Sequence, residues 1–296
     1  WHTASFDSKR RDHDIPEWGG DPGPGLKLHV WGEQGLGDQI LFASQIKDAR
    51  DAGLEVTLEV DPRLVPLFAR SGLNGNVFGY DQVPADVLAQ CQAQCPLGSL
   101  GRVFRRNSVD FSDASPYLQA DTAIVAELKD KYEALSEGRT IIGVSWNSVN
   151  PKFGIEKSVS LEACFPILQT EEVFFVSLQY GDVQAKIDSI RESLEVDIYV
   201  DIGVDHMADL DRAAAQIAAM DLVITSSNTT AHLSGALGRD TWVMVHKTPE
   251  WRWGLARKES PWYSHVRIFR QQKTGDWSGP VQAVADALRA RVKTYR

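Results

Sequence analysis

The sequence predicts an α/β protein built from two Rossmann-like domains. Short apolar runs of strand length alternate along the chain with stretches that carry apolar residues at helical spacing, a pattern typical of parallel sheets covered by helices. The alternation stops in an irregular stretch at 81–120, which Pro and Gly residues divide into short pieces, and it resumes at Thr140. A chain of 296 residues, of which 43% are hydrophobic, has enough apolar surface for two such domains.

The first series follows a polar segment, residues 1–25, whose Gly and Pro residues favour an arm or linker. The run LKLHVW predicts a strand and leads into the glycine-rich loop GEQGLGD. The stretch after this loop has apolar residues at the spacing of a helix. The expected elements of this half are a strand at 26–31, a helix at 39–52, a strand at 54–60, a helix at 62–72 and a helix at 121–135.

The second series begins with TIIGVSW, which is apolar enough for a strand buried on both faces. Strands are expected at 140–146, 173–179, 222–225 and 241–245, and helices at 160–169, 182–194, 209–221, within 226–238 and at 278–292. We therefore divide the chain into an arm (1–25), an N-terminal domain (26–137), a C-terminal domain (138–278) and a last helix (279–296) that packs back on the N-terminal domain.

The composition excludes several classes of protein. A net charge of −9 and a pI near 5.3 argue against a nucleic-acid partner, because general nucleic-acid binders carry a basic surplus. Cys91, Cys95 and Cys164 are odd in number and lack metal-ligand spacing, so we expect structural thiols. No apolar run reaches the ~20 residues of a transmembrane segment.

The start of the chain predicts a segment of a longer protein. The chain opens at Trp1 with a polar, charged stretch that lacks the apolar core of a signal peptide. We therefore expect a cytoplasmic protein with a further domain upstream of these residues.

Known nucleotide and catalytic motifs are missing from the sequence. The glycines of GEQGLGD have the spacing G-x-x-G-x-G, which differs from the dinucleotide fingerprint, and there is no GK[ST] phosphate loop or G-x-S-x-G elbow. Asp209 and Asp211 form a D-x-D pair of the kind that metal-dependent transferases use. Because this pair starts a predicted helix, we interpret it as a favourable interaction with the helix dipole. We expect no metal and no other cofactor.

The glycine loop after the first strand is the first candidate site. Gly32, Gly35 and Gly37 let the backbone turn sharply and approach a ligand. They place Asp38 at the carboxyl end of the strand, where open α/β sheets bind ligands. The Asp38 carboxylate could accept a proton from an attacking sugar hydroxyl, or it could only cap the following helix. The residues alone leave both interpretations open.

The segment after the apolar strand LVIT is the second candidate site. Small polar residues end this strand and begin a helix, whose N-terminal N–H groups and hydroxyl groups suit an anion such as a diphosphate. Ordinary helix capping is the alternative. The side chain of His232 could donate to a phosphate oxygen or satisfy a backbone carbonyl. The residues expected at this site are Ser227, Asn228, Thr229, Thr230 and His232.

Two further segments carry charged or aromatic residues that suit the same ligand. Lys152 and Lys157 follow the strand at 140–146, and either could neutralise a phosphate, although a solvated lysine is the alternative for each. The aromatic side chains at 251–263 could stack on a sugar or a base. We expect Trp251 and Trp253 to pack within the domain instead.

Together these segments resemble glycosyltransferase family 9, the group that contains the ADP-heptose heptosyltransferases. They are most similar to the transferase-like domains that follow tetratricopeptide repeats in bacterial proteins. The resemblance covers residues 26–295. The motifs that carry it are WGEQGLGDQILFA (31–43), SVSLEACFPIL (158–168), VSLQYG (176–181), DLVITSSNTTAHLSGALG (221–238) and PEWRWGLARKESPWYSHVRIFRQ (249–271).

The resemblance implies a GT-B fold, in which two Rossmann-like domains face a central cleft, with the acceptor on the N-terminal half and the donor on the C-terminal half. It implies an inverting, metal-independent transfer of a hexosyl or heptosyl group from a nucleotide-diphosphate sugar to a glycan, lipid or protein acceptor. Asp38 matches the family's proposed base, and Gly35 and Gly37 lie in the loop near the acceptor. The expected donor-binding residues are Lys157, Gln179, Ser227, Asn228, Thr229, Thr230 and His232.

One departure from the family keeps other functions open. The family usually has Asp where this chain has Asn228, a change that preserves the helix cap and leaves the donor's identity open. Asn228 favours a non-catalytic carbohydrate- or partner-binding module, whereas Asp38 favours the enzyme. A nucleotide-sugar epimerase is the third candidate and requires further acid or base groups. An upstream tetratricopeptide-repeat domain is an expected partner.

Overall fold

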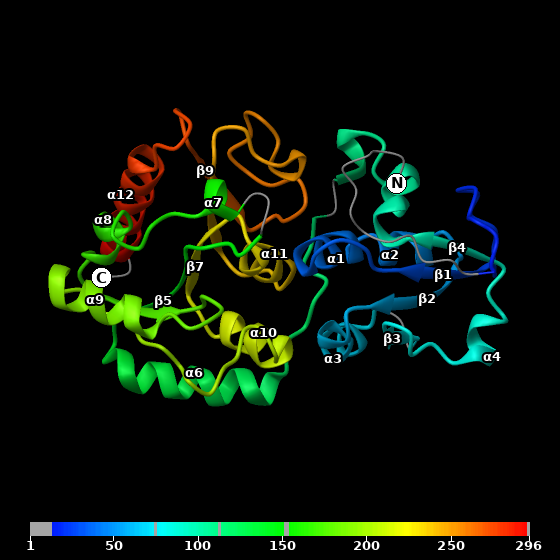
Figure 1. The fold of residues 1–296 in the computed structure, drawn as a ribbon, viewed down its shortest axis with the longest axis horizontal. Helices are drawn as coiled ribbons and strands as arrows, with labels where there is room; N and C mark the ends of the chain where they lie inside the picture. The colour runs from blue at the N-terminus through cyan, green and yellow to red at the C-terminus, as the bar shows by residue number, and fades with distance from the viewer. Residues whose placement is uncertain (1–13, 74–75, 112–113, 151–153, 295–296) are drawn as a thin grey trace. The chain divides into compact units, whose positions relative to one another are not determined.

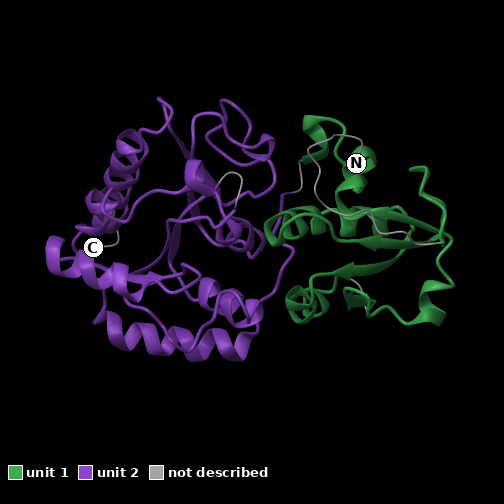
Figure 2. Cartoon of the chain, viewed as in Figure 1, with its two compact units in different colours: residues 1–113 green, residues 114–296 purple. Residues whose placement is uncertain are grey.

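The computed structural model describes residues 14–73, 76–111, 114–150 and 154–294 (Figure 1). The chain forms two compact units, residues 1–113 and residues 114–296 (Figure 2). Each unit contains a parallel sheet with helices, so the predicted α/β class with two Rossmann-like domains is confirmed. Residues 1–13 of the predicted arm lie outside the described residues. The rest of the arm contacts the first sheet, where the Trp18 N–H donates to the Gln94 carbonyl at 2.8 Å.

The sheet of the first unit has four parallel strands in the order β3-β2-β1-β4. These strands are β1 (Lys27–Trp31), β2 (Glu55–Val60), β3 (Val77–Gly79) and β4 (Ala93–Pro96). The central strands β1 and β2 are buried along most of their length, as their apolar sequences predict. The edge strands β3 and β4 were not predicted, because both are short and β4 is also partly polar. Strand β4 also contacts β1 through a hydrogen bond from Trp31 Nε1 to Gln94 Oε1 at 2.6 Å.

The helices of the first unit are shorter than the sequence predicts. The single helix expected at 39–52 is two helices that break at Ser44, whose hydroxyl donates to the Leu41 carbonyl at 2.7 Å and competes with the helical ladder. The helices of this unit are α1 (Leu36–Ala43), α2 (Ile46–Asp51), α3 (Val65–Arg70), α4 (Ala85–Leu88) and α5 (Gly101–Phe104), with 3₁₀ turns at Pro62–Leu64, Leu97–Leu100 and Ser108–Phe111.

The sheet of the second unit has five parallel strands in the order β6-β5-β7-β8-β9. They are β5 (Thr140–Ser145), β6 (Val173–Ser177), β7 (Leu222–Ser226), β8 (Thr241–Val245) and β9 (Val266–Arg270). The first four were predicted, and β9 was not. From β5 the chain moves to β6 on one side, and it then returns to β7 on the other side. The order in which the chain adds strands to the sheet therefore reverses between β5 and β7.

Helices pack on this second sheet (Figure 1). They are α6 (Thr122–Ser136), α7 (Gly154–Lys157), α8 (Phe165–Leu168), α9 (Gln184–Leu194), α10 (Leu210–Ala218), α11 (Thr229–Ala236) and α12 (Ser278–Thr294), with a 3₁₀ turn at Trp251–Trp253. In the part of the chain that the structure describes, no helix combines the length and the apolar character needed to cross a membrane.

The structure corrects two of the predicted domain assignments. The division between the units lies after residue 113 and not after residue 137, so α6 belongs to the second unit. Helix α6 packs against α10 there, and its Tyr132 hydroxyl donates to Asp201 at 2.7 Å. The second correction concerns the last helix, which was expected to pack back on the N-terminal domain. The apolar face of α12, with Val281, Val284 and Leu288, lies in the core of the second unit.

Candidate functional site

The candidate site lies between β5 and β7, where the strand order of the second sheet reverses. Ser145 and Thr225 pair at the carboxyl ends of these two strands. The chains that leave the two strands diverge from this point, and open α/β sheets bind their ligands in the resulting crevice. The fold thus brings together the segments 145–147 and 226–228, which are far apart in the sequence.

Asn228 connects these two segments. It is the N-cap of α11, and its Oδ1 accepts a hydrogen bond from the Thr230 N–H at 2.9 Å. Its Nδ2 donates to Ser145 Oγ at 2.8 Å and to the Asn147 carbonyl at 3.1 Å. The capping prediction is therefore confirmed for Asn228, and the same amide also joins α11 to the end of β5.

Gln179 supports the same connection from β6. Its Oε1 accepts hydrogen bonds from Ser145 Oγ at 3.1 Å, from the Trp146 N–H at 2.9 Å and from the Asn147 N–H at 2.8 Å. The side chain is 5% exposed. Its amide oxygen is thus committed to holding the end of β5, and a contact between Gln179 and a nucleoside stays a prediction.

Lys157 lies beside the start of α11, as the sequence predicts. The residue that connects the two is Glu250, which was not predicted. The Lys157 ammonium group forms an ion pair with Glu250 Oε1. Ser227, which directly precedes the N-cap of α11, donates through its hydroxyl to Glu250 Oε2 at 3.3 Å. The same hydroxyl accepts from Trp253 Nε1 at 2.7 Å. Glu250 therefore connects Lys157 to Ser227. Lys152 lies outside the described residues.

His232 is buried in the first turns of α11, where it is neutral. Its ring stacks on Trp253 with centroids 5.4 Å apart, and its Nδ1 lies 3.1 Å from the Tyr263 hydroxyl. Burial lowers the pKa of His232 well below its ordinary value, and the positive charges of Arg252 and Lys157 lower it further. A neutral imidazole is able to donate one hydrogen bond without adding charge.

The aromatic residues next to this site divide into a buried and an exposed part. Trp253 is 1% exposed, so the packing prediction is confirmed for it. Trp251 is 61% exposed, and its ring meets that of Trp262 edge-on with centroids 5.7 Å apart, so the packing prediction was wrong for Trp251. Thr229, at the first position of α11, is half-buried.

Asp38 lies in the first turn of α1 in the first unit. Helix α1 begins at Leu36, one residue after its N-cap Gly35, so Gly37 and Asp38 are both helical. The N-cap of α1 is Gly35, so the alternative that Asp38 is the N-cap was wrong. Asp38 lies at the third helical position, and its Oδ2 accepts from the Gly35 N–H at 3.3 Å, the backward contact of a capping box. Asp38 is half-buried, and a role as a base stays a prediction.

Glu33 is a buried carboxyl in the same loop that the sequence analysis missed. It is 5% exposed, and its Oε1 accepts from the Gly98 N–H at 3.0 Å. A Cβ at Gly98 would lie 2.6 Å from that oxygen, so only glycine leaves room for the carboxyl. Its Oε2 finds no hydrogen-bond partner among the described residues. Burial raises the pKa of Glu33 to about 7, and the negative charge of Asp38 raises it as well.

Asp209 of the D-x-D pair is the N-cap of α10, and Asp211 lies in the first turn of that helix. The Asp209 carboxylate accepts from the Arg212 N–H at 2.9 Å at the start of α10. Across the described ranges, no three or more His, Cys, Asp or Glu side chains gather in an arrangement that could hold a metal ion.

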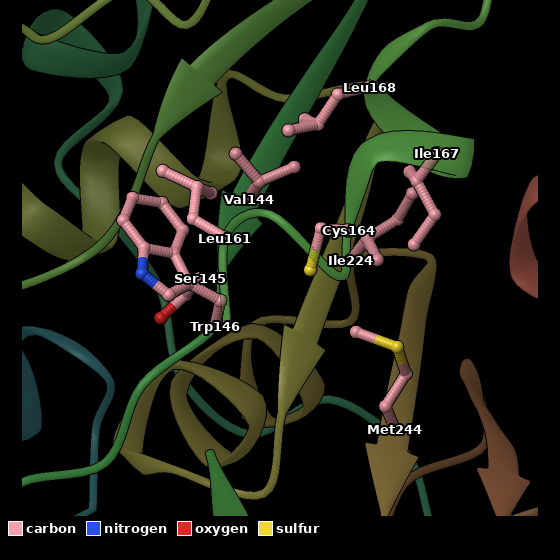
Figure 3. A pocket seen from close by; sticks show the side chains of 9 residues that line it. All are labelled: Val144, Ser145, Trp146, Leu161, Cys164, Ile167, Leu168, Ile224 and Met244. Carbon is pink, nitrogen blue, oxygen red and sulfur yellow. The ribbon is translucent and has the colours of Figure 1, made fainter. Parts of the chain in front are cut away.

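A small apolar cavity lies behind the end of β5 (Figure 3). Its volume is about 10 Å³, and Ser145 is its one polar lining residue among Val144, Trp146, Leu161, Cys164, Ile167, Leu168, Ile224 and Met244. A space of this size holds one water molecule at most, so the cavity is a packing gap and not a ligand site. The Cys164 thiol points into it (Figure 3), and burial raises the pKa of that thiol to about 12. Cys91, Cys95 and Cys164 are all free thiols.

Known structures share this fold. The ADP-heptose LPS heptosyltransferase II of E. coli is 15% identical and superimposes with a TM-score of 0.64, covering 91% of this chain and 99% of that one. A family 9 glycosyltransferase of Veillonella parvula is 13% identical with a TM-score of 0.60, covering 93% of this chain and 99% of that one. The predicted GT-B fold class is thereby confirmed at the level of the fold.

Sequence comparison identifies one relative, whose name does not state an activity. Protein FlbA of Caulobacter vibrioides is 33% identical over 289 residues, which cover 92% of this chain and 48% of FlbA. The chain thus spans about half the length of this curated relative. No family model matches the chain.

Replacement of Asn228 by Asp is expected to destabilise the second unit. An aspartate cannot donate to the Asn147 carbonyl and would place negative charge against it, so we expect Asn228→Asp to lower the free energy of unfolding by about 1–3 kcal/mol. Urea unfolding of the whole chain measures this loss. The same change at the exposed Asn150 is the control and should cost little. Equal stability of the two variants would contradict the connecting role of Asn228.

The Glu33 carboxyl predicts a pH-dependent difference in stability. Its folded pKa of about 7 lies above the ordinary value of 4.5, so the stability that its protonated form contributes is fully present below about pH 4.5 and is lost as pH rises through 7. Relative to Glu33→Gln, the wild type should therefore lose roughly 3 kcal/mol of unfolding free energy across this range. Urea unfolding at several pH values tests this, with the exposed Glu55→Gln as control. Parallel pH curves for wild type and Glu33→Gln would contradict it.

Proposed function

We propose that this chain is an inverting, metal-independent glycosyltransferase domain of family 9, related to the transferase-like domains that follow tetratricopeptide repeats. It takes a sugar from a nucleotide-diphosphate sugar and transfers it to a glycan, lipid or protein acceptor. The observation that carries the proposal is the start of α11, which lies where the strand order of the sheet reverses. Lys157, Ser227 and Asn228 surround this helix N-terminus. The fold shared with an ADP-heptose heptosyltransferase supports it.

The donor diphosphate binds at the N-terminus of α11 in this proposal. The backbone dipole of α11 favours negative charge there. Thr229 contributes its N–H and hydroxyl groups, Thr230 its hydroxyl group, Lys157 the positive charge, and neutral His232 one hydrogen bond. These groups can neutralise a diphosphate leaving group without a divalent cation.

Asp38 is the base in this proposal. As the acceptor hydroxyl attacks the anomeric carbon, its proton becomes acidic, and a half-buried carboxylate accepts it late in the reaction. The N–H that Gly35 donates to one carboxylate oxygen fixes the orientation of the group.

Two structural features support the alternatives. Because Asp38 caps its own helix, a capping role alone accounts for its presence, as a non-catalytic carbohydrate-binding module would require. The epimerase alternative needs a further acid or base, and Glu33, with a pKa near 7, is a group of that kind. Activity on a sugar nucleotide alone, without an acceptor, would favour the epimerase.

Calorimetry with ADP, GDP, UDP and CMP sugars tests the donor site directly. We expect at least one nucleotide sugar to bind with a micromolar dissociation constant, unchanged by EDTA. Loss of binding in EDTA, with recovery on adding Mg²⁺ or Mn²⁺, would contradict metal independence. Binding to none of the nucleotide sugars would contradict the donor site itself.

The variant Asp38→Asn separates the base from the cap. Asparagine keeps the shape and a capping oxygen but cannot take the proton, so turnover should fall by about 10²–10⁴-fold while donor affinity changes little. Asp51→Asn is the matched control, because Asp51 is an exposed residue of α2 in the same unit. Near-normal turnover of Asp38→Asn would remove Asp38 from the mechanism.

A further inference from the structure

We propose that Glu250 is an internal substitute for a ligand phosphate, and that a donor binds by taking Lys157 and Ser227 away from it. This inference rests on the proposed donor site at α11. It adds that the affinity of this site is set by competition between the ligand and a carboxylate of the protein itself.

The contacts of Glu250 are those expected of a bound anion. One carboxylate oxygen pairs with the Lys157 ammonium group, and the other accepts from the Ser227 hydroxyl. A phosphate oxygen at the start of α11 would use the same two donors. Glu250 therefore occupies the position at which the proposed site would hold its ligand.

Burial gives this carboxylate a stabilising role when no ligand is bound. The side chains of Lys157 and Glu250 are 9% and 17% exposed. A lysine buried to this degree is strongly destabilising without an opposite charge nearby. Glu250 supplies that charge, and a phosphate that displaced it would supply it equally well.

The geometry also allows the carboxylate to leave. Its contact with Ser227 is long, at 3.3 Å, whereas the contact of Ser227 with the Trp253 indole is 2.7 Å. Ser227 would therefore keep its position on Trp253 and turn its hydroxyl proton to the ligand. Glu250 precedes a single 3₁₀ turn, Trp251–Trp253, in a segment where Trp251 and Leu255 are 61% and 77% exposed. Its side chain can swing toward solvent without disturbing the core.

Competition of this kind predicts that removing the charge of Glu250 strengthens anion binding. Glu250→Gln keeps the size of the side chain but no longer repels the ligand or competes as an anion for Lys157. We expect the dissociation constants of inorganic pyrophosphate and of ADP to fall roughly tenfold, as the loss of one nearby like charge implies.

Calorimetry on the whole chain at about pH 7.5 and low salt tests the proposal with these two probes. Glu259→Gln is the matched control, because it removes the same charge from an exposed residue of the same segment and should leave both dissociation constants unchanged. The double variant Glu250→Gln/Lys157→Gln should lose the gain, because the released ammonium group is its source. If Glu250→Gln does not fold, Glu250→Asp keeps the charge but shortens the side chain, and it should give a smaller gain.

The outcomes separate this inference from the proposed function. If ADP binding depends on Lys157 but does not strengthen in Glu250→Gln or Glu250→Asp, the donor site stands and the competition is refuted. If both variants bind more weakly than wild type, Glu250 holds the ligand or its lysine in place, and the proposal is again overturned. If neither probe binds to wild type or to either Glu250 variant, the donor site and this inference fail together.

Discussion

The hydrogen bonds of Asn228 hold the candidate site together. Through one amide group they join the end of β5, at Ser145 and Asn147, to the start of α11. The strands β5 and β7 belong to opposite halves of the sheet, and the ladder between them pairs Ser145 with Thr225 at their ends. Gln179 adds a second connection from β6. A rigid frame of this kind lets a helix N-terminus present its N–H groups to a ligand at a fixed place.

The charged pair Lys157 and Glu250 lies next to this frame. Hydrogen bonds between neutral groups stabilise the frame, whereas opposite charges stabilise the pair. Lys157 and Glu250 are two largely buried ions, and each one compensates the cost of burying the other. Neutral His232 and the Trp253 indole border the pair without adding charge. The arrangement suits a site that must stay folded when empty and accept an anion when one is present.

The elements of the fold could be predicted from the sequence wherever the chain is uniformly apolar. Runs such as TIIGVSW predicted their strands, because only a buried strand accommodates so many consecutive apolar residues. The edge strand β4 carries Gln94 at its centre, and its apolar pattern is too short to recognise. The amphipathic pattern of α12 shows that one face is buried, but a periodicity does not say against which core.

The site could be predicted only in part, because some of its contacts join residues that lie far apart in the sequence. Helix-capping residues such as Asn228 act on their sequence neighbours, so a local pattern revealed the start of α11. Glu250 and Glu33 act on residues far along the chain, at Lys157 and at Gly98, and no local pattern connects such pairs. Polar residues in otherwise aromatic or glycine-rich loops are the one signal that could have drawn attention to them.

Hydrogen exchange measured by mass spectrometry, with and without a bound nucleotide sugar, shows whether the donor diphosphate binds at the start of α11. We expect the ligand to slow exchange of the backbone N–H groups at 228–232 and of the segment around Lys157. Slowed exchange confined to the glycine loop and α1 of the first unit would contradict it.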